Sequence, residues 1–187
     1  NSLVDEGEGL VRFPNKLVIT DDSEQRNGTK YDISSMDLSE YDGHITADHI
    51  DSLSTIIGSV RGLAKVGNRV VIDAIQYAVK ENPLARLAYD LLRSPHGYSR
   101  NFSIETYGSP LDDDNIYRNA KLIGLSQVVV GNNKSASLTN DLMQVVTNSI
   151  EQSRKDGLDV SDVEKQFLAG QQDIKKKETK QMSDKKD

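Results

Sequence analysis

The sequence has no cysteine among its 187 residues. A disulfide framework, thiolate zinc sites and cysteine nucleophiles are therefore excluded. Tryptophan is also absent, and three histidines are too few for a convincing histidine metal cluster. No run of about 18 apolar residues occurs, so we expect no membrane-spanning helix and no membrane partner.

The charge is acidic, with a formal net charge of −6 at pH 7. Many of the acidic residues lie in residues 1–60, which contain twelve Asp and Glu but only four Lys and Arg. An acidic chain without tryptophan and with scattered basic residues is a poor nucleic-acid binder, so we expect no nucleic-acid partner. The length corresponds to about one domain with a small additional segment.

The middle of the chain alternates between β and α patterns. The Gly67-Asn68 pair supplies the positive φ of a tight turn, which predicts a hairpin around it. Asn82 and Pro83 are an N-cap and a first helical residue, and apolar residues then recur at helical spacing to Arg93. Strands are predicted at residues 10–13, 16–19, 56–66, 69–74, 101–107 and 122–130.

The C-terminal third is expected to be helical. An apolar stripe begins after Ser137, Gly157 ends that helix, and a second helix is predicted from Val160 to Gln172. The last residues, 173–187, are rich in lysine and too polar to bury a core, so we expect a charged, flexible tail. The stripe is formed by Leu138, Leu142, Val145, Val146 and Ile150.

Two residues are candidates for chemistry, and neither is specific alone. His49 stands between Asp48 and Asp51, which could tune its pKa, but a single histidine is usually structural or exposed, as expected for His44 and His96. Ser103 lies on a predicted strand and has no Gly-x-Ser-x-Gly elbow, which argues against an α/β-hydrolase.

The order of several short motifs along the chain is more specific than any one of them. His49 is followed by Ile57-Gly58-Ser59-Val60, the apolar helix, Tyr98-Ser99-Arg100-Asn101-Phe102-Ser103-Ile104, Leu122-Ile123-Gly124-Leu125-Ser126-Gln127-Val128 and a Gly131-Asn132-Asn133 turn. This order, from about Leu10 to Ala136, resembles the prohead (capsid-maturation) proteases of tailed bacteriophages.

The resemblance implies a fold and an activity. The family is similar in fold to the herpesvirus assembly proteases, so we expect an α+β protein. Its core would be a closed, mostly antiparallel β-barrel surrounded by helices, with a C-terminal helical extension. The implied divisions are a protease domain at 1–136, a helical segment at 137–172 and the tail at 173–187.

The same resemblance makes Ser103 the nucleophile and His49 the general base of a serine endopeptidase. Its substrates would be scaffold proteins, the major capsid protein and its own termini, processed inside the assembling prohead in the host cytoplasm. No cofactor is implied. Candidate self-cleavage sites are Leu38-Ser39-Glu40 and Ser149-Ile150-Glu151.

A third catalytic residue is suggested by one departure from the family pattern. Gly124 stands where the family has Glu, and Glu105 stands where the family has Gly, two residues after the nucleophile. If the two strands are antiparallel and Ser103 faces Ser126, then Glu105 faces Gly124, within about 4.5–5.5 Å between Cβ positions. We therefore predict Glu105 as the third member.

Several alternatives remain open at this point. Ser126, Asp48 or Asp51 could take the third role instead of Glu105. The Gly131–Asn133 turn is a weak candidate for the oxyanion hole, because backbone amides leave little trace in a sequence. The C-terminal helices could form a homodimer contact or a scaffold-like tether.

Two other functions compete with the protease. Gly124 at the family's Glu position favours an inactive scaffolding or capsid-interior protein that retains the protease fold. The third hypothesis is an unrelated β-barrel binding module in which His49 and Ser103 lie far apart.

Overall fold

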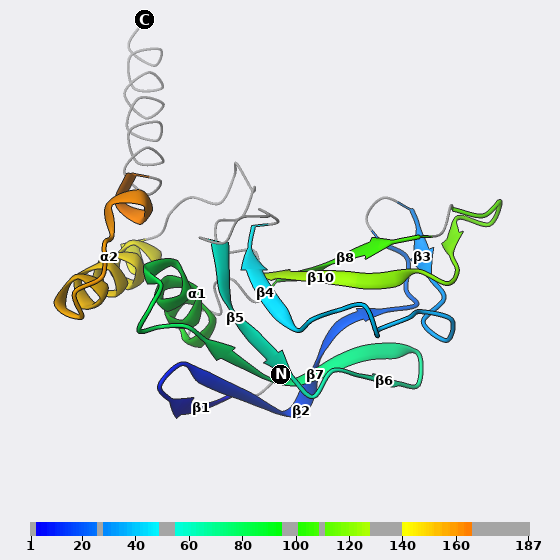
Figure 1. Ribbon diagram of the computed structural model, residues 1–187, viewed down its shortest axis with the longest axis horizontal. Helices are drawn as coiled ribbons and strands as arrows, with labels where there is room; N and C mark the ends of the chain where they lie inside the picture. Colours follow the sequence, from blue (N-terminus) through cyan, green and yellow to red (C-terminus); the bar gives the residue numbers. More distant parts are fainter. Residues whose placement is uncertain are drawn as a thin grey trace, which may run out of the picture.

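The computed structural model describes residues 3–25, 28–48, 55–94, 101–108, 111–127 and 140–165. Its main element is a mixed eight-stranded sheet, with a small two-stranded sheet, β3 (Lys30–Tyr31) and β9 (Ile116–Tyr117), at one end (Figure 1). The main strands are β1 (Val4–Gly7), β2 (Leu10–Asp21), β4 (His44–Ala47), β5 (Ile56–Arg61), β6 (Ala64–Val66), β7 (Arg69–Tyr77), β8 (Phe102–Tyr107) and β10 (Lys121–Gln127).

The sheet is open, so the expected closed barrel is wrong, although the α+β class is correct. The strand order is β1-β2-β7-β5-β4-β10-β8, with β6 against β7, and the end strands β1 and β8 do not pair with each other in the described residues. A barrel requires a consistent tilt and stagger across every strand pair. Here β4 and β10 are parallel and meet at only Ser126↔Thr46 and Gln127↔Ala47.

The helices that the structure describes do not surround this sheet. Within the described chain, α1 (Pro83–Arg93) packs on β5 and β7, and α2 (Asn140–Lys155) packs on α1, so both lie at the same end of the molecule (Figure 1). None of the described helices has both the length and the apolar composition needed to cross a bilayer.

β2 is a single long strand, where two strands separated by Pro14 were predicted. Its ladder with β7 is interrupted between Arg12↔Ala74 and Leu17↔Ile72, and then resumes in a shifted register. Proline has no N–H to complete the ladder, so the chain bulges at this point. Lys16 takes a positive φ of 56°, and the strand continues beyond it.

The predicted hairpin and first helix are confirmed. Gly67 has a φ of 57° and connects β6 to β7. The Asn82 side chain accepts a 2.8 Å hydrogen bond from the Leu84 N–H, and Pro83 is the first residue of α1. An N-cap of this kind contributes about 1 kcal/mol to stability.

The C-terminal helix also ends as predicted. The Leu158 N–H donates to the Ser153 carbonyl and the Gly157 N–H donates to the Arg154 carbonyl, with Gly157 at φ 81°. This is a Schellman motif, in which glycine supplies the left-handed conformation. The beginning of a second helix follows at residues 161–165.

The apolar stripe of α2 is partly placed. Val146 and Ile150 are buried and Val145 is partly buried against the core. Because α2 packs on α1, this supports a packing role for that part of the stripe. The predicted boundary at 136/137 and the tail at 173–187 lie outside the described residues.

A polar junction formed by Gln127 lies inside the core. The fully buried Gln127 accepts a 2.7 Å hydrogen bond from the Tyr77 hydroxyl and donates a 3.2 Å bond to the Ala88 carbonyl. Burial raises the pKa of Tyr77, so its hydroxyl stays protonated and donates. One side chain of β10 is thus tied to both β7 and α1.

A second polar junction joins β1 to α1 through Asp5. The Tyr89 hydroxyl donates to one Asp5 oxygen at 2.5 Å, Arg93 contacts the other at 2.5 Å, and the Arg93 guanidinium lies 4.5 Å from the Tyr89 ring centre. Burial alone raises the pKa of Asp5, but hydrogen bonds from Tyr89 and the Gly7 N–H, with the charge of Arg93, outweigh it and lower the pKa. Burial and the Asp5 contact raise the pKa of Tyr89 to about 12.

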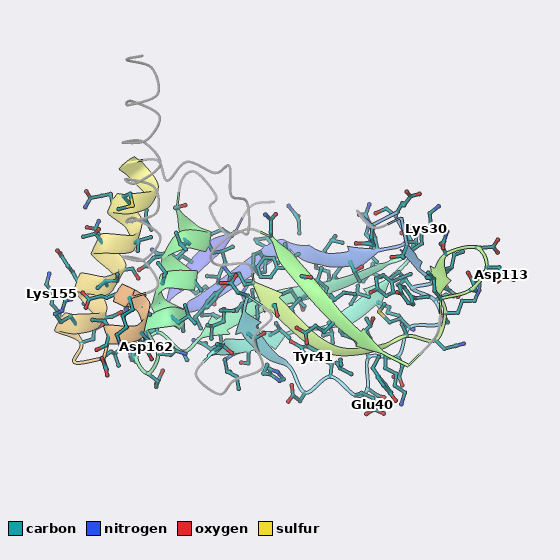
Figure 2. All side chains as sticks on the ribbon, turned by 90° about the horizontal axis from the view of Figure 1, so that it is seen from above. Lys30, Glu40, Tyr41, Asp113, Lys155 and Asp162 are labelled. Carbon is teal, nitrogen blue, oxygen red and sulfur yellow. The ribbon has the colours of Figure 1, made fainter. Side chains whose placement is uncertain are left out.

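We predict that Asp5→Asn lowers the melting temperature at pH 7. Because the folded-state pKa of Asp5 lies below its usual 3.8, its contribution is complete above that pH and disappears as the pH falls through the lower folded-state value. The difference in melting temperature between the variant and wild type should therefore shrink in acid. Asp113→Asn is the control, because Asp113 is exposed on a loop at the opposite end of the molecule from α2 (Figure 2). An equal, pH-independent effect of the two substitutions would contradict the prediction.

Candidate functional site

The candidate site lies where β8, β10 and β4 meet. β8 and β10 lie side by side (Figure 1). They are antiparallel, with Ser103 opposite Ser126 and Glu105 opposite Gly124. This is the register that the sequence predicted, and both pairs are therefore on one face of the sheet. A bulge between Leu122 and Gly124 shifts the rest of the ladder and leaves these two pairs unaffected.

The Glu105 side chain occupies the space above Gly124. An ideal Cβ built on Gly124 would lie 2.9 Å from Glu105 Oε2 and 3.2 Å from Glu105 Cβ. Real Cβ atoms almost never come within 3.0 Å of another heavy atom, so a side chain at 124 would have to displace the carboxylate. The Glu and Gly at these positions are thus sterically complementary, as the exchange hypothesis requires.

Ser126 connects Glu105 to β4. Its hydroxyl lies 3.3 Å from Glu105 Oε1 and 2.8 Å from the Thr46 hydroxyl, and Thr46 is its partner in the parallel β4–β10 ladder. Ser126 is fully buried and Thr46 is 5% exposed, whereas Ser103 and Glu105 are half-buried. The site therefore joins a buried hydroxyl pair to a carboxylate that reaches solvent.

The position of Ser103 is set by the pairing of β8 with β10 and not by a hydrogen bond of its side chain. No hydrogen bond links its hydroxyl to another residue of the described chain, and Glu105 bonds to Ser126 instead. A serine hydroxyl becomes nucleophilic only when a base within hydrogen-bond reach removes its proton. The described residues place the hydroxyl and a carboxylate on one face of the sheet, and none of them forms a hydrogen bond to that hydroxyl.

His49, the predicted base, lies outside the described residues, as do Asp51, His96 and the Gly131–Asn133 turn. The described segment 28–48 ends at Asp48, one residue before His49. The Asp48 N–H donates a 3.1 Å hydrogen bond to the Gln127 carbonyl. Asp48 has a φ of 55°, a left-handed conformation that is uncommon for residues other than glycine. The strand ends carrying Asp48 and Ser126 are therefore adjacent.

His44 is the one histidine inside the described segments. It begins β4, and its Nδ1 contacts the Asp42 carboxylate, while its backbone carbonyl accepts from the Tyr41 hydroxyl. No interaction links it to Ser103. The described residues also contain no group of three or more His, Asp or Glu that could hold a metal ion.

A shallow groove of about 320 Å³ lies elsewhere on the molecule. It is lined by residues of β5, β7 and the β7–α1 connection together with Glu8. Neither Ser103 nor Glu105 borders this groove, so it does not form part of the candidate site.

Thr46 is the site residue that sequence reasoning missed. It was not singled out because its place depends on the parallel pairing of β4 with β10, two strands 80 positions apart that share no turn. The available signal in the sequence is a threonine between the apolar residues Ile45 and Ala47, which are almost fully buried in the structure.

No protein-family model matches the chain, and no curated protein or solved structure matches it either.

We predict that Gly124→Ala changes stability in a way that depends on Glu105. Alanine in a strand is ordinarily more stable than glycine by roughly 0.5–1 kcal/mol. In wild type this gain should be cancelled, because the new methyl group displaces the carboxylate from Ser126. In a Glu105→Ala background the same substitution should raise the melting temperature. An identical shift in both backgrounds would show that the Glu105 side chain does not occupy this space.

Proposed function

We propose that the chain is a serine endopeptidase of phage prohead maturation, cleaving scaffold proteins and the major capsid protein. The observation that carries the proposal is the pairing of Ser103 with Ser126 and of Glu105 with Gly124. It places a carboxylate on the serine's face of the sheet, opposite the glycine that replaces the family's Glu. The ordered motifs from Leu10 to Ala136, which resemble the prohead proteases, supply the reaction class.

The mechanism assigns one role to each group. His49 accepts the Ser103 proton as the hydroxyl attacks the scissile carbonyl carbon, and then returns the proton to the leaving amine. Water then attacks the acyl-enzyme. His49 accepts a proton from the water and returns it to the Ser103 oxygen, which releases the new carboxyl end. Glu105 accepts a hydrogen bond from the His49 ring, which fixes its tautomer and stabilises the imidazolium formed during attack.

A second function is favoured by the contacts that Glu105 already makes. The carboxylate bonds Ser126 and covers Gly124, which are contacts that also suit a purely structural side chain. A scaffolding or capsid-interior protein without protease activity would use Glu105 in this way. The two functions differ in whether Ser103 reacts.

The two candidate self-cleavage sites lie in folded segments. Glu40 forms a 2.8 Å ion pair with Lys121 of β10, and Leu38 packs against the core. Ser149 and Ile150 are buried in α2. Because a protease needs an extended and accessible segment, self-cleavage at either place would require local unfolding.

We predict that a fluorophosphonate probe labels the full chain at Ser103. Ser103→Ala and His49→Ala should abolish both labelling and cleavage of scaffold protein, and the double variant should be little worse than either single one, because members of a catalytic unit are non-additive. Ser59→Ala, which alters an exposed strand serine, is the matched control and should label normally. A folded wild-type chain that does not label would favour the structural function. Normal cleavage by Ser103→Ala would refute the nucleophile.

We predict that Glu105→Gln lowers turnover by roughly 10- to 1000-fold without changing the fold, scaled down from the about 10⁴-fold loss in a well-studied triad because water screens a half-buried carboxylate. Combining Glu105→Gly with Gly124→Glu should recover part of the loss, since it restores the family arrangement across the same pair. Glu81→Gln, an exposed control, should be neutral. Near-normal turnover of Glu105→Gln would exclude Glu105 as the third residue.

A further inference from the structure

Three side chains from three adjacent strands form a polar row behind the candidate site. Thr46 of β4, Ser126 of β10 and Glu105 of β8 are linked by contacts of 2.8 Å and 3.3 Å. Thr46 and Ser126 are directly paired in the β4–β10 ladder. Glu105 lies on β8, two residues beyond the position that faces Ser126, and its side chain reaches along the sheet face to the Ser126 hydroxyl. The row begins in the protein interior and ends at the half-buried carboxylate.

The chemistry of the groups fixes the direction of these bonds. An ionised carboxylate can only accept hydrogen bonds, whereas a hydroxyl has one proton to donate and two lone pairs. The Ser126 proton is therefore donated to Glu105 Oε1, so Ser126 accepts the Thr46 proton. Each hydroxyl polarises the next, so the donor strength directed at Glu105 depends on Thr46 as well as on Ser126.

Burial makes the row costly to leave incomplete. Ser126 is fully buried and Thr46 nearly so, and an unpaired buried hydroxyl costs about 1–3 kcal/mol. The 3.3 Å contact between the Ser126 hydroxyl and Glu105 Oε1 is longer than the usual 2.7–2.8 Å between oxygens. The other oxygen of the carboxylate, Oε2, lies over the position that a side chain at Gly124 would occupy.

We infer that Thr46 and Ser126 are positioning residues, which orient the Glu105 carboxylate by donating one oriented row of hydrogen bonds to Oε1 and leave Oε2 for the catalytic histidine. This inference rests on the proposed protease function. It also assigns Ser126 a role different from that of an alternative third catalytic residue, because its only proton is donated to Glu105.

The first test measures fluorophosphonate labelling kinetics of the full chain. Thr46→Val keeps the shape of the side chain and removes the hydroxyl, and should lower the limiting labelling rate about 3- to 10-fold, as expected for one neutral hydrogen bond, with unchanged probe affinity. Thr46→Ser should restore the rate. Thr20→Val is the control, because Thr20 is also a buried threonine but lies on β2, and it should leave the labelling rate unchanged.

Dependence on Glu105 separates positioning from general damage to the sheet. In a Glu105→Gln background, Thr46→Val should cause no further loss beyond about twofold, because the carboxylate that it orients is gone. An equal loss in both backgrounds, or a Thr46→Ser variant as slow as Thr46→Val, would overturn the inference.

The second test does not require activity. Thr46→Val and Glu105→Ala should shift the urea unfolding midpoint by less together than the sum of their separate shifts, although the two side chains do not bond each other. In a Ser126→Ala background their shifts should become additive, because the connecting hydroxyl is missing. Additive shifts in wild type overturn the row. If the row is confirmed and wild type does not label, the proposed protease function fails while the structural link stands.

Discussion

The β8–β10 ladder is the constraint on which the candidate site depends, and the buried amide of Gln127 fixes the position of β10 in the core. Gln127 has one arrangement in which its amide oxygen meets the Tyr77 hydroxyl and its nitrogen meets the Ala88 carbonyl. A one-residue shift of β10 against β7 and α1 would turn this amide to the opposite face and leave those partners unsatisfied. The pairing of β10 with β8 places Ser103 opposite Ser126 and Glu105 opposite Gly124.

The two faces of β10 therefore have different tasks. Leu125 and Gln127 point toward the core and α1, where apolar packing and two hydrogen bonds stabilise the strand. Gly124 and Ser126 point to the opposite face, where a missing side chain and a buried hydroxyl accommodate Glu105. Because side chains alternate along a strand, the residues of β10 that stabilise the core and those that contact Glu105 lie on opposite faces.

The openness of the sheet changes how the site is built. In a closed barrel every strand has two neighbours, whereas β8 pairs only with β10 among the described strands. Within the described residues, Glu105 contacts Ser126 of β10 and is connected through it to Thr46 on β4. β4 and β10 pair at two positions, at the ends of both strands and next to Asp48, so this contact lies where both strands end.

Local chemistry in the sequence determined much of the fold. The Asn82–Pro83 start of α1, the Gly67 turn and the Gly157 helix end were predictable because each depends on neighbouring residues. The Ser103–Ser126 register was predictable from a reciprocal Glu and Gly exchange. The tertiary structure alone decided that the sheet stays open, that β2 continues past Pro14, and that Thr46 lies beside Ser126. These features depend on pairings between strands distant in sequence, whose energies come from burial and ladder geometry that no local pattern records.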